Sequence, residues 1–255
     1  MKVLVVAHVF YPRLWPELAV CIRNVTEPKD IVITYVDEAS VAEARRDFPN
    51  ARFVLCENRG YDVWPFLKVL QQTGLSAYDL VVKLHTKRDI DFGFDFRFNG
   101  YHFNGPVWRD RLLSFCRTDA AWRRTRSRFD DPGVGMVADH HLIVGRGDVH
   151  YDHARRAYDA ALGEVAALGG MRVDAGCGRF VAGTMFAVRP EILVFLLKRG
   201  FGLDMFPPSE HVRPDDCQYA HVVERMLGLA VCACGLRIVP ADGFIKRMWS
   251  FLTRQ

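Results

Sequence analysis

The stretch "KVLVVAH", residues 2–8, is a run of apolar, strand-forming residues that polar residues interrupt only at its two ends. A strand buried on both faces has this pattern, whereas a strand with one wet face alternates apolar and polar residues. Similar runs follow, separated by helix-like segments. The runs cover 30–36, 51–58 and 79–86, and the helix-like segments cover 16–25, 38–49 and 63–74. This β-α-β-α-β-α-β order predicts an α/β fold with a mainly parallel sheet flanked by helices.

The second half of the sequence is less regular, and nothing in its composition marks a linker. We therefore expect a single domain over residues 1–255. The expected elements are a helix at 107–128, a strand at 133–139, a helix at 152–169, a strand, turn and helix at 179–200, a helix at 215–231 and a last strand at 236–243.

The charge balance limits the classes of partner. A formal net charge of +4 over 255 residues is too weak to indicate nucleic-acid binding. Residues 97–128 are nevertheless rich in arginine, and Asp110 and Asp119 are their only acids. This segment is either a solvated helix or a contact for a phosphorylated or acidic partner.

The cysteines and the N-terminus indicate a reducing compartment. The seven cysteines are odd in number and form no CxxC pair, so we expect free thiols rather than disulfides or a zinc site. The apolar run before His8 is too short for a secretory signal, and no run approaches the ~20 apolar residues that span a bilayer. We expect a cytoplasmic protein that is at most peripheral to a membrane.

Polar and aromatic residues gather after three of the predicted strands. The clusters are "HVFYPRLW" at 8–15, "ENRGYDVWPF" at 57–66 and "HTKRD" at 85–89. In an open parallel sheet, ligands bind beyond the carboxyl ends of the strands, where the strand order reverses. The three clusters therefore predict one binding site.

The second cluster contains a turn between a strand and a helix. Gly60 allows a tight turn or the close approach of a ligand. Asp62 either caps the helix that begins near Val63 or, together with Asn58 and Arg59, contacts the base or ribose of a nucleotide.

Five motifs occur in a characteristic order. They are "HVFYPRLWPEL" (8–18), "ENRGYDVWPFL" (57–67), "YDLVVKLHTKRD" (78–89), "FVAGTMFAVRPEIL" (180–193) and "DDCQYAHVVER" (215–225). Together they resemble the rhamnan synthesis F family, glycosyltransferases of bacterial surface polysaccharides. The resemblance runs from residue 8 to about residue 226. The aromatic segment 91–106 does not match the family pattern and is a candidate substrate loop.

The resemblance implies a GT-A-like fold, in which a Rossmann-type nucleotide-binding half (1–106) carries an acceptor-side half (107–255) folded onto it. It also implies a nucleoside-diphosphate sugar donor, often dTDP-rhamnose, and a growing glycan as acceptor. The first motif supplies His8, Phe10 and Tyr11 as candidate contacts to the nucleotide sugar.

The end of the fourth predicted strand departs from ordinary GT-A enzymes, which place a metal-binding Asp-x-Asp there. This chain has Lys83, His85 and Lys87, which share one strand face if the strand continues as far as Lys87. We hypothesise that these side chains offset the charge of the leaving diphosphate in place of a metal.

Two alternatives to this hypothesis stay open. The lysines could pair with acids of a neighbouring strand. Asp89 and Asp91 also form an Asp-x-Asp slightly downstream, which could bind Mn²⁺ or Mg²⁺. The main hypothesis itself requires no cofactor.

The fifth motif supplies the candidate general base. An inverting transferase needs a carboxylate to accept the proton of the acceptor hydroxyl, and Asp216 or its neighbour Asp215 fits the family position. The alternative is that these aspartates only cap the following helix.

Three further residues are candidates through the resemblance. Thr184 could donate a hydrogen bond to a sugar hydroxyl, or belong to a tight turn in the core. Trp108 could stack on the acceptor sugar and Arg109 could reach a phosphate, or the tryptophan could simply begin a helix half-buried.

The C-terminal segment 243–255 mixes basic and aromatic residues. It either lies on a membrane surface near a lipid-linked acceptor or packs on the domain as a helix.

A rival to the glycosyltransferase hypothesis is that the chain is a non-catalytic module that binds nucleotide or glycan within a larger synthase.

Overall fold

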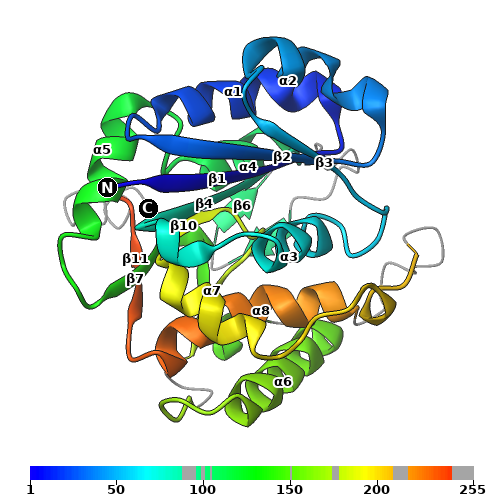
Figure 1. Cartoon of the computed structure of the whole chain (residues 1–255). Coiled ribbons are helices and arrows are strands. Elements are labelled where there is room, and N and C mark those ends of the chain that lie inside the picture. Colours follow the sequence, from blue (N-terminus) through cyan, green and yellow to red (C-terminus); the bar gives the residue numbers. More distant parts are fainter. Residues whose placement is uncertain are drawn as a thin grey trace.

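A seven-stranded sheet with helices on both faces forms the centre of the molecule in the computed structural model (Figure 1). The described residues are 1–87, 96–98, 101–103, 105–149, 151–173, 178–208 and 218–242. The strand order is β11-β7-β10-β4-β1-β2-β3. The strands are β1 (Val3–Val9), β2 (Lys29–Tyr35), β3 (Arg52–Leu55), β4 (Leu80–His85), β7 (Val134–Ala138), β10 (Phe186–Val188) and β11 (Arg237–Pro240).

The first half of the chain folds as the apolar runs predict. Every residue of β1 and β4 is buried, as expected for strands covered on both faces. Neighbours in the β3-β2-β1-β4 part pair in parallel. The connecting helices are α1 (Trp15–Asn24), α2 (Ala42–Asp47) and α3 (Val63–Gln71). The α/β class with a mainly parallel sheet flanked by helices is therefore confirmed.

The expected helix at 107–128 is two helices, α4 (Gly105–Leu113) and α5 (Asp119–Arg128). Thr118 begins α5, because its hydroxyl accepts a hydrogen bond from the amide of Ala121 at 3.1 Å. A side-chain cap of this kind satisfies one of the first amides of a helix. Most arginines of these helices pair with acids, for example Arg109 with Glu17 and Arg123 with Asp119, which agrees with the solvated-helix alternative.

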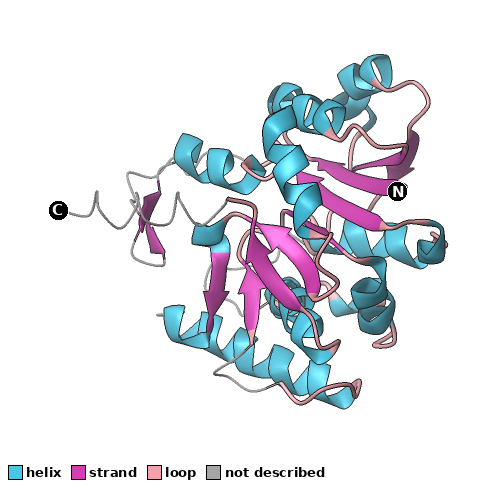
Figure 2. Cartoon of the chain, turned by 90° about the vertical axis from the view of Figure 1, so that its left-hand side faces the viewer, coloured by secondary structure: helices cyan, strands magenta, loops and turns pink. Residues whose placement is uncertain are grey.

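The rest of the second half completes the sheet and one of its faces. α6 (Asp152–Ala167), α7 (Pro190–Leu197) and α8 (Tyr219–Ala233) follow the predicted order, and short ladders join β8 (Ile143–Gly145) to β9 (Arg179–Val181) and β5 (Phe96–Phe98) to β6 (Tyr101–Phe103). Helices α1 and α2 cover one face of the sheet, whereas α3, α7 and α8 cover the other, with α6 outside α8 (Figure 1). Figure 2 shows the β5–β6 ladder apart from the main sheet.

The topology places a reversal of strand order between β1 and β4. The chain runs from β1 outward to β2 and β3, and then returns to β4 on the other side of β1. β10 is antiparallel to both β4 and β7, so β7 runs in the same direction as β4. The carboxyl ends of β1, β4 and β7 therefore lie at one edge, and the strand order reverses between β1 and β4.

None of the helices within the described ranges combines the length and apolar character needed to cross a bilayer. The C-terminal segment 243–255, for which sequence analysis offered a membrane contact, lies outside the described residues. The division into a nucleotide-binding half and an acceptor-side half stays a prediction. Strands from both halves of the chain share the main sheet.

Candidate functional site

The site lies where β1 and β4 end side by side. His8 and His85 are partners in the parallel pairing of the two strands. The hydroxyl of Thr86 accepts hydrogen bonds from the amides of Phe10 and Tyr11, each at 2.9 Å. This contact ties the loop after β1 to the end of β4, so the first and third sequence clusters meet as predicted.

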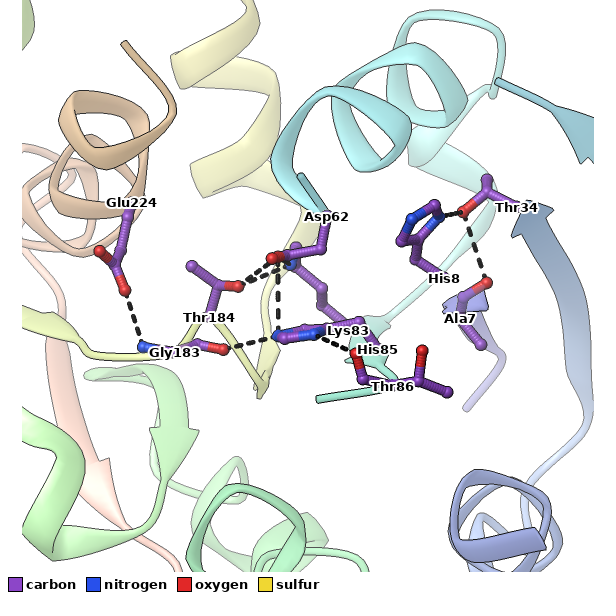
Figure 3. A network of polar contacts seen from close by, with 10 residues as sticks. All are labelled: Ala7, His8, Thr34, Asp62, Lys83, His85, Thr86, Gly183, Thr184 and Glu224. Carbon is purple, nitrogen blue, oxygen red and sulfur yellow. Dashed lines mark hydrogen bonds and ion pairs between the residues drawn. The ribbon is translucent and has the colours of Figure 1, made fainter. Parts of the chain in front are cut away.

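Asp62 lies at the centre of a buried polar network beside β4 (Figure 3). It precedes α3, but its side chain does not cap that helix, so the capping prediction is wrong. Its carboxylate instead pairs with the ammonium of Lys83 and accepts a hydrogen bond from the hydroxyl of Thr184. His85 Nε2 lies 3.7 Å from the same carboxylate.

Lys83 therefore has an internal carboxylate partner, as the first alternative proposed, but on a loop rather than on a neighbouring strand. Its side chain is 1% exposed and also donates to the hydroxyl of Thr184 at 2.8 Å. Because Lys83 and His85 both reach Asp62, the expectation that they share one strand face is confirmed.

A strained turn between β9 and β10 completes the network. Gly183 and Thr184 both have positive φ angles, 78° and 55°. The Gly183 amide donates to the carboxylate of Glu224 on α8 at 2.7 Å, and its carbonyl accepts from His85 Nε2 at 2.8 Å. A threonine in this left-handed region costs free energy that its surroundings must offset. The contacts to Asp62, Lys83 and Glu224 supply that support.

The network is nearly neutral in itself. Burial alone would raise the pKa of Asp62, but neighbouring His85, Lys83 and Lys87 outweigh it and hold the pKa of the carboxyl below its usual range. Burial lowers the pKa of Lys83, and Asp62 opposes that shift. The charges of Asp62 and Lys83 therefore cancel, and the charge of Glu224 is offset by its ion pair with Arg225.

The two histidines are neutral near pH 7. Burial lowers the pKa of His8 to about 3 and that of His85 to about 4. The Nδ1 atom of His8 lies 2.9 Å from the hydroxyl of Thr34. Because the Gly183 carbonyl can only accept, Nε2 of His85 carries the proton. The charge left over in this group is the positive charge of Lys87, which makes no ion pair with the described part of the chain.

The lowered pKa values of these two histidines predict a loss of stability in mild acid. The unfolded chain protonates each histidine below pH 6.5, whereas the folded chain resists until about pH 3 for His8 and about pH 4 for His85. The unfolded state binds more protons in this window, so the free energy of unfolding should fall as the pH falls. We expect a loss of about 2 kcal/mol for each histidine between pH 7 and pH 5.

Urea unfolding at the two pH values measures this loss. His8→Gln should remove about 2 kcal/mol of the difference between the two pH values, which is the share of one such buried histidine. An equal pH dependence in wild type and His8→Gln would contradict the assignment of this histidine.

Exposed side chains border the network. Phe10 is 37% exposed and Tyr61 is 45% exposed, whereas Arg59 and Lys87 are half-buried and Asn58 is exposed. Aromatic faces beside cations are suited to a ligand that combines a ring with phosphate.

Tyr61 is a residue that sequence analysis missed. Its φ angle of 54° lies in the left-handed region, directly after Gly60 with a φ angle of 61°. A β-carbon at Gly60 would approach Phe206 to 2.6 Å, so this position has room only for glycine. Gln218 donates to the Tyr61 hydroxyl at 2.8 Å, and the ring stacks on His221 at 6.1 Å between centroids. An exposed aromatic ring in a strained conformation is a candidate ligand contact.

The predicted acceptor contacts have internal partners. Trp108 is 6% exposed, and a β-carbon at Gly183 would lie 3.1 Å from its ring. Arg109 donates to the carboxylate of Glu17 on α1 at 3.3 Å. The tryptophan is thus packed at a helix start, and a role in acceptor binding stays a prediction.

Several candidates lie outside the described residues. The candidate general bases Asp215 and Asp216 and the candidate metal ligands Asp89 and Asp91 are among them. Sequence analysis also missed two described groups at the carboxyl edge, namely Glu224 and an Asp-His-His triplet at 139–141.

Up to Lys87, where the described part of this segment stops, the end of β4 offers a divalent metal no pair of carboxylates. His85, Thr86 and Lys87 stand there, and the nearby carboxylate of Asp62 already pairs with Lys83. An ammonium group in place of a ligand repels a cation, and hard cations prefer several oxygen ligands.

The fold and the polar network define a class: an α/β protein whose candidate site lies at the switch point of a mainly parallel sheet. The chain belongs to the rhamnan synthesis protein F family, whose model matches residues 1–235. The resemblance found in the motifs is therefore confirmed. Membership of this family connects the chain with polysaccharide biosynthesis.

Two curated relatives have the name "Uncharacterized protein WxcX" and come from two strains of Xanthomonas campestris pv. campestris, B100 and ATCC 33913. Each is 29% identical over 252 residues, which cover 93% of this chain and 32% of the relative. The chain thus spans about a third of the length of these relatives. A solved structure of CMP:2-keto-3-deoxy-manno-octonic acid synthetase with CTP covers 100% of this chain and 99% of its own at 10% identity and a TM-score of 0.41, too low to support an argument.

Proposed function

We propose that the chain is a glycosyltransferase that moves a sugar, with rhamnose as first candidate, from a nucleoside-diphosphate donor to a growing bacterial surface polysaccharide or lipid-linked glycan. Membership of the rhamnan synthesis protein F family supports the polysaccharide role. The observation that carries the nucleotide part is the excess positive charge of Lys87 beside a neutral buried network at the switch point. A GT-A-like division of labour between the two halves belongs to this proposal.

In this proposal, Lys87 and Arg59 contact the donor diphosphate and stabilise the charge of the leaving group. Exposed Phe10 and Tyr61 offer aromatic faces to the base or the sugar. Lys83 acts as a positioning residue, because its ammonium is buried against Asp62. The surroundings of the same site are formed by His8, Tyr11, Asn58, Gly60, His85 and Thr184.

The transfer step is proposed as inverting. Asp216 or Asp215 would accept the proton of the acceptor hydroxyl while the bond to the diphosphate breaks. Trp108 and Arg109 would border the acceptor only after a rearrangement of their present contacts. The internal pairing of Asp62 favours charge stabilisation by lysine and arginine over a metal at the end of β4.

Nucleotide binding tests the proposal first. Titration calorimetry with UDP, GDP, CDP, ADP and dTDP, with and without Mg²⁺, should reveal binding that does not need the metal. Lys87→Ala should weaken it about tenfold or more, because a charge-assisted hydrogen bond contributes about 1.5–3 kcal/mol. Lys2→Ala, at the amino edge of the sheet, is the matched control and should bind normally.

Turnover tests the second part. Release of the nucleoside diphosphate from a panel of donor sugars should need an acceptor glycan, and Asp216→Asn or Asp215→Asn should abolish it while binding persists. Binding without turnover by the wild-type protein would instead indicate a non-catalytic module. Activity that EDTA abolishes and Mn²⁺ restores would favour a metal-dependent transferase using Asp89 or Asp91.

A further inference from the structure

A second polar cluster lies at the same edge of the sheet, at the end of β7. Asp139 follows β7, and His140 and His141 form the first turn of a short helix after it (His140–Leu142). Asp242 comes two residues after β11, the strand that pairs with β7. The two imidazole rings lie side by side, with centroids 3.6 Å apart and a tilt of 38°.

Three potential ligand atoms converge in this cluster, and the carboxylate of Asp242 lies next to one of them. Asp139 Oδ1 lies 2.8 Å from His141 Nδ1 and 3.9 Å from His140 Nδ1. His140 Nδ1 also lies 3.9 Å from Asp242 Oδ2. The ligand atoms of the Asp139-His140-His141 group all lie within 4.8 Å of one another. Two nitrogens and one oxygen thus face a common point, and Asp242 lies beside them through its contact with His140.

The surroundings hold Asp139 with Oδ1 toward the histidines. Its other oxygen, Oδ2, accepts a hydrogen bond from Ser114 Oγ at 2.7 Å and lies 3.7 Å from Arg111. Oδ1 also accepts from the amide of His141 at 2.9 Å. The carboxylate is wholly buried, so these contacts fix its orientation before any ligand arrives.

Both carboxylates of the cluster lie largely out of solvent. Asp139 and Asp242 are 0% and 15% exposed. Carboxylates removed from water in this way are suited to a cation that coordinates them.

We propose that Asp139, His140 and His141 bind a divalent transition-metal ion, with Zn²⁺ as the first candidate and Asp242, 3.9 Å from His140 Nδ1, as the fourth ligand. Two imidazole nitrogens and two carboxylate oxygens suit Zn²⁺, which takes four ligands of these types. Each imidazole would keep its proton on Nε2 and offer Nδ1 to the ion. For His141, this means that the proton it now shares with Asp139 moves to the other ring nitrogen.

The ion would join the ends of β7 and β11, which already pair through the amide of Ala241 and the carbonyl of Ala138 at 2.9 Å. Its role is therefore structural, at a place distinct from the nucleotide site, because β10 separates β7 from β4. Asp242 also lines a groove of about 330 Å³, which gives the cluster an approach from solvent.

The test uses untagged protein stripped with a chelator and then titrated with Zn²⁺ by calorimetry, with Co²⁺ absorption as a second readout of the coordination geometry. We expect one ion per chain and a rise in melting temperature on binding. His140→Ala and Asp242→Asn should each weaken binding at least about 100-fold, since even the loss of an outer partner costs 10–100-fold. His153→Ala, on α6, should bind as wild type does.

Three results would overturn the proposal: no binding at micromolar Zn²⁺, binding that His140→Ala and Asp242→Asn leave unchanged, or stability that depends on pH but not on the metal. Nucleoside diphosphate titrations of stripped protein separate the two sites. They should be unaffected by removal of the ion, whatever the fate of the proposed transferase activity.

Discussion

Replacing Asp62 with alanine should lower the free energy of unfolding by about 3–5 kcal/mol, because it leaves the charge of Lys83 buried without a partner. The ammonium of Lys83 is 1% exposed, so water cannot replace the lost carboxylate. Thr184, already strained, would lose its acceptor at the same time. Urea unfolding at pH 7 measures the change.

An exposed ion pair is the matched control. Asp119 and Arg123 pair one turn apart on α5, with side chains 48% and 65% exposed. Solvent screens such a pair, so Asp119→Ala should cost only about 0.5 kcal/mol. Equal losses for Asp62→Ala and Asp119→Ala would show that burial does not determine the strength of the Lys83 pair.

A double variant tests the cause of the loss. When both charges of a buried pair are replaced by apolar groups, stability often returns, because no unpaired charge is left behind. Asp62→Ala combined with Lys83→Met should therefore recover much of the loss caused by Asp62→Ala alone. A double variant that is no more stable than the single one would place the cost in lost packing around Asp62 instead.

The parallel half of the fold was predictable because its signals are local. Apolar runs such as residues 2–8 show burial on both faces, and each intervening segment has helical spacing. The antiparallel β10 was not predictable in the same way. It contains only three residues, Phe186–Val188, and its place between β4 and β7 depends on partners far along the chain.

In the candidate site, too, local features were predictable from the sequence, whereas contacts between residues far apart in sequence were not. The three clusters at strand ends were found, because parallel strands bring their carboxyl ends together by rule. The partner of Asp62 was missed, because a cap is a contact of neighbouring residues, whereas Lys83 lies 21 residues and Thr184 lies 122 residues away in sequence. A one-dimensional pattern favours the local partner over the distant one.

One miss was avoidable. Asp139, His140 and His141 lie at the end of a strand that sequence analysis predicted at 133–139. The rule that selected the other strand ends applies to this one equally. Glu224, by contrast, gives no such signal, because its role depends on how α8 packs beside the turn at Gly183.

Two glycines within helices should respond in opposite ways to substitution by alanine, because only one of them packs against a neighbouring strand. Gly228 on α8 faces β9 so closely that a β-carbon would lie 2.2 Å from Phe180 Cα and 2.4 Å from the Arg179 carbonyl oxygen. These are backbone atoms that cannot rotate away, so Gly228→Ala should cost about 3 kcal/mol, the upper end of the usual range for overpacking. A β-carbon at Gly163 on α6 would meet no described atom within 4 Å, and Gly163→Ala should stabilise by about 0.5–1 kcal/mol.

The position of α8 also links this packing to the site. Glu224 lies one turn before Gly228 on the same helical face, so a shift of α8 away from β9 moves its carboxylate away from the Gly183 amide. Gly228→Ala should therefore weaken nucleoside diphosphate binding as well as stability, whereas Gly163→Ala should change stability alone. Urea unfolding and calorimetry on the two variants measure both effects. A stabilised Gly228→Ala protein would mean that α8 does not approach β9 this closely.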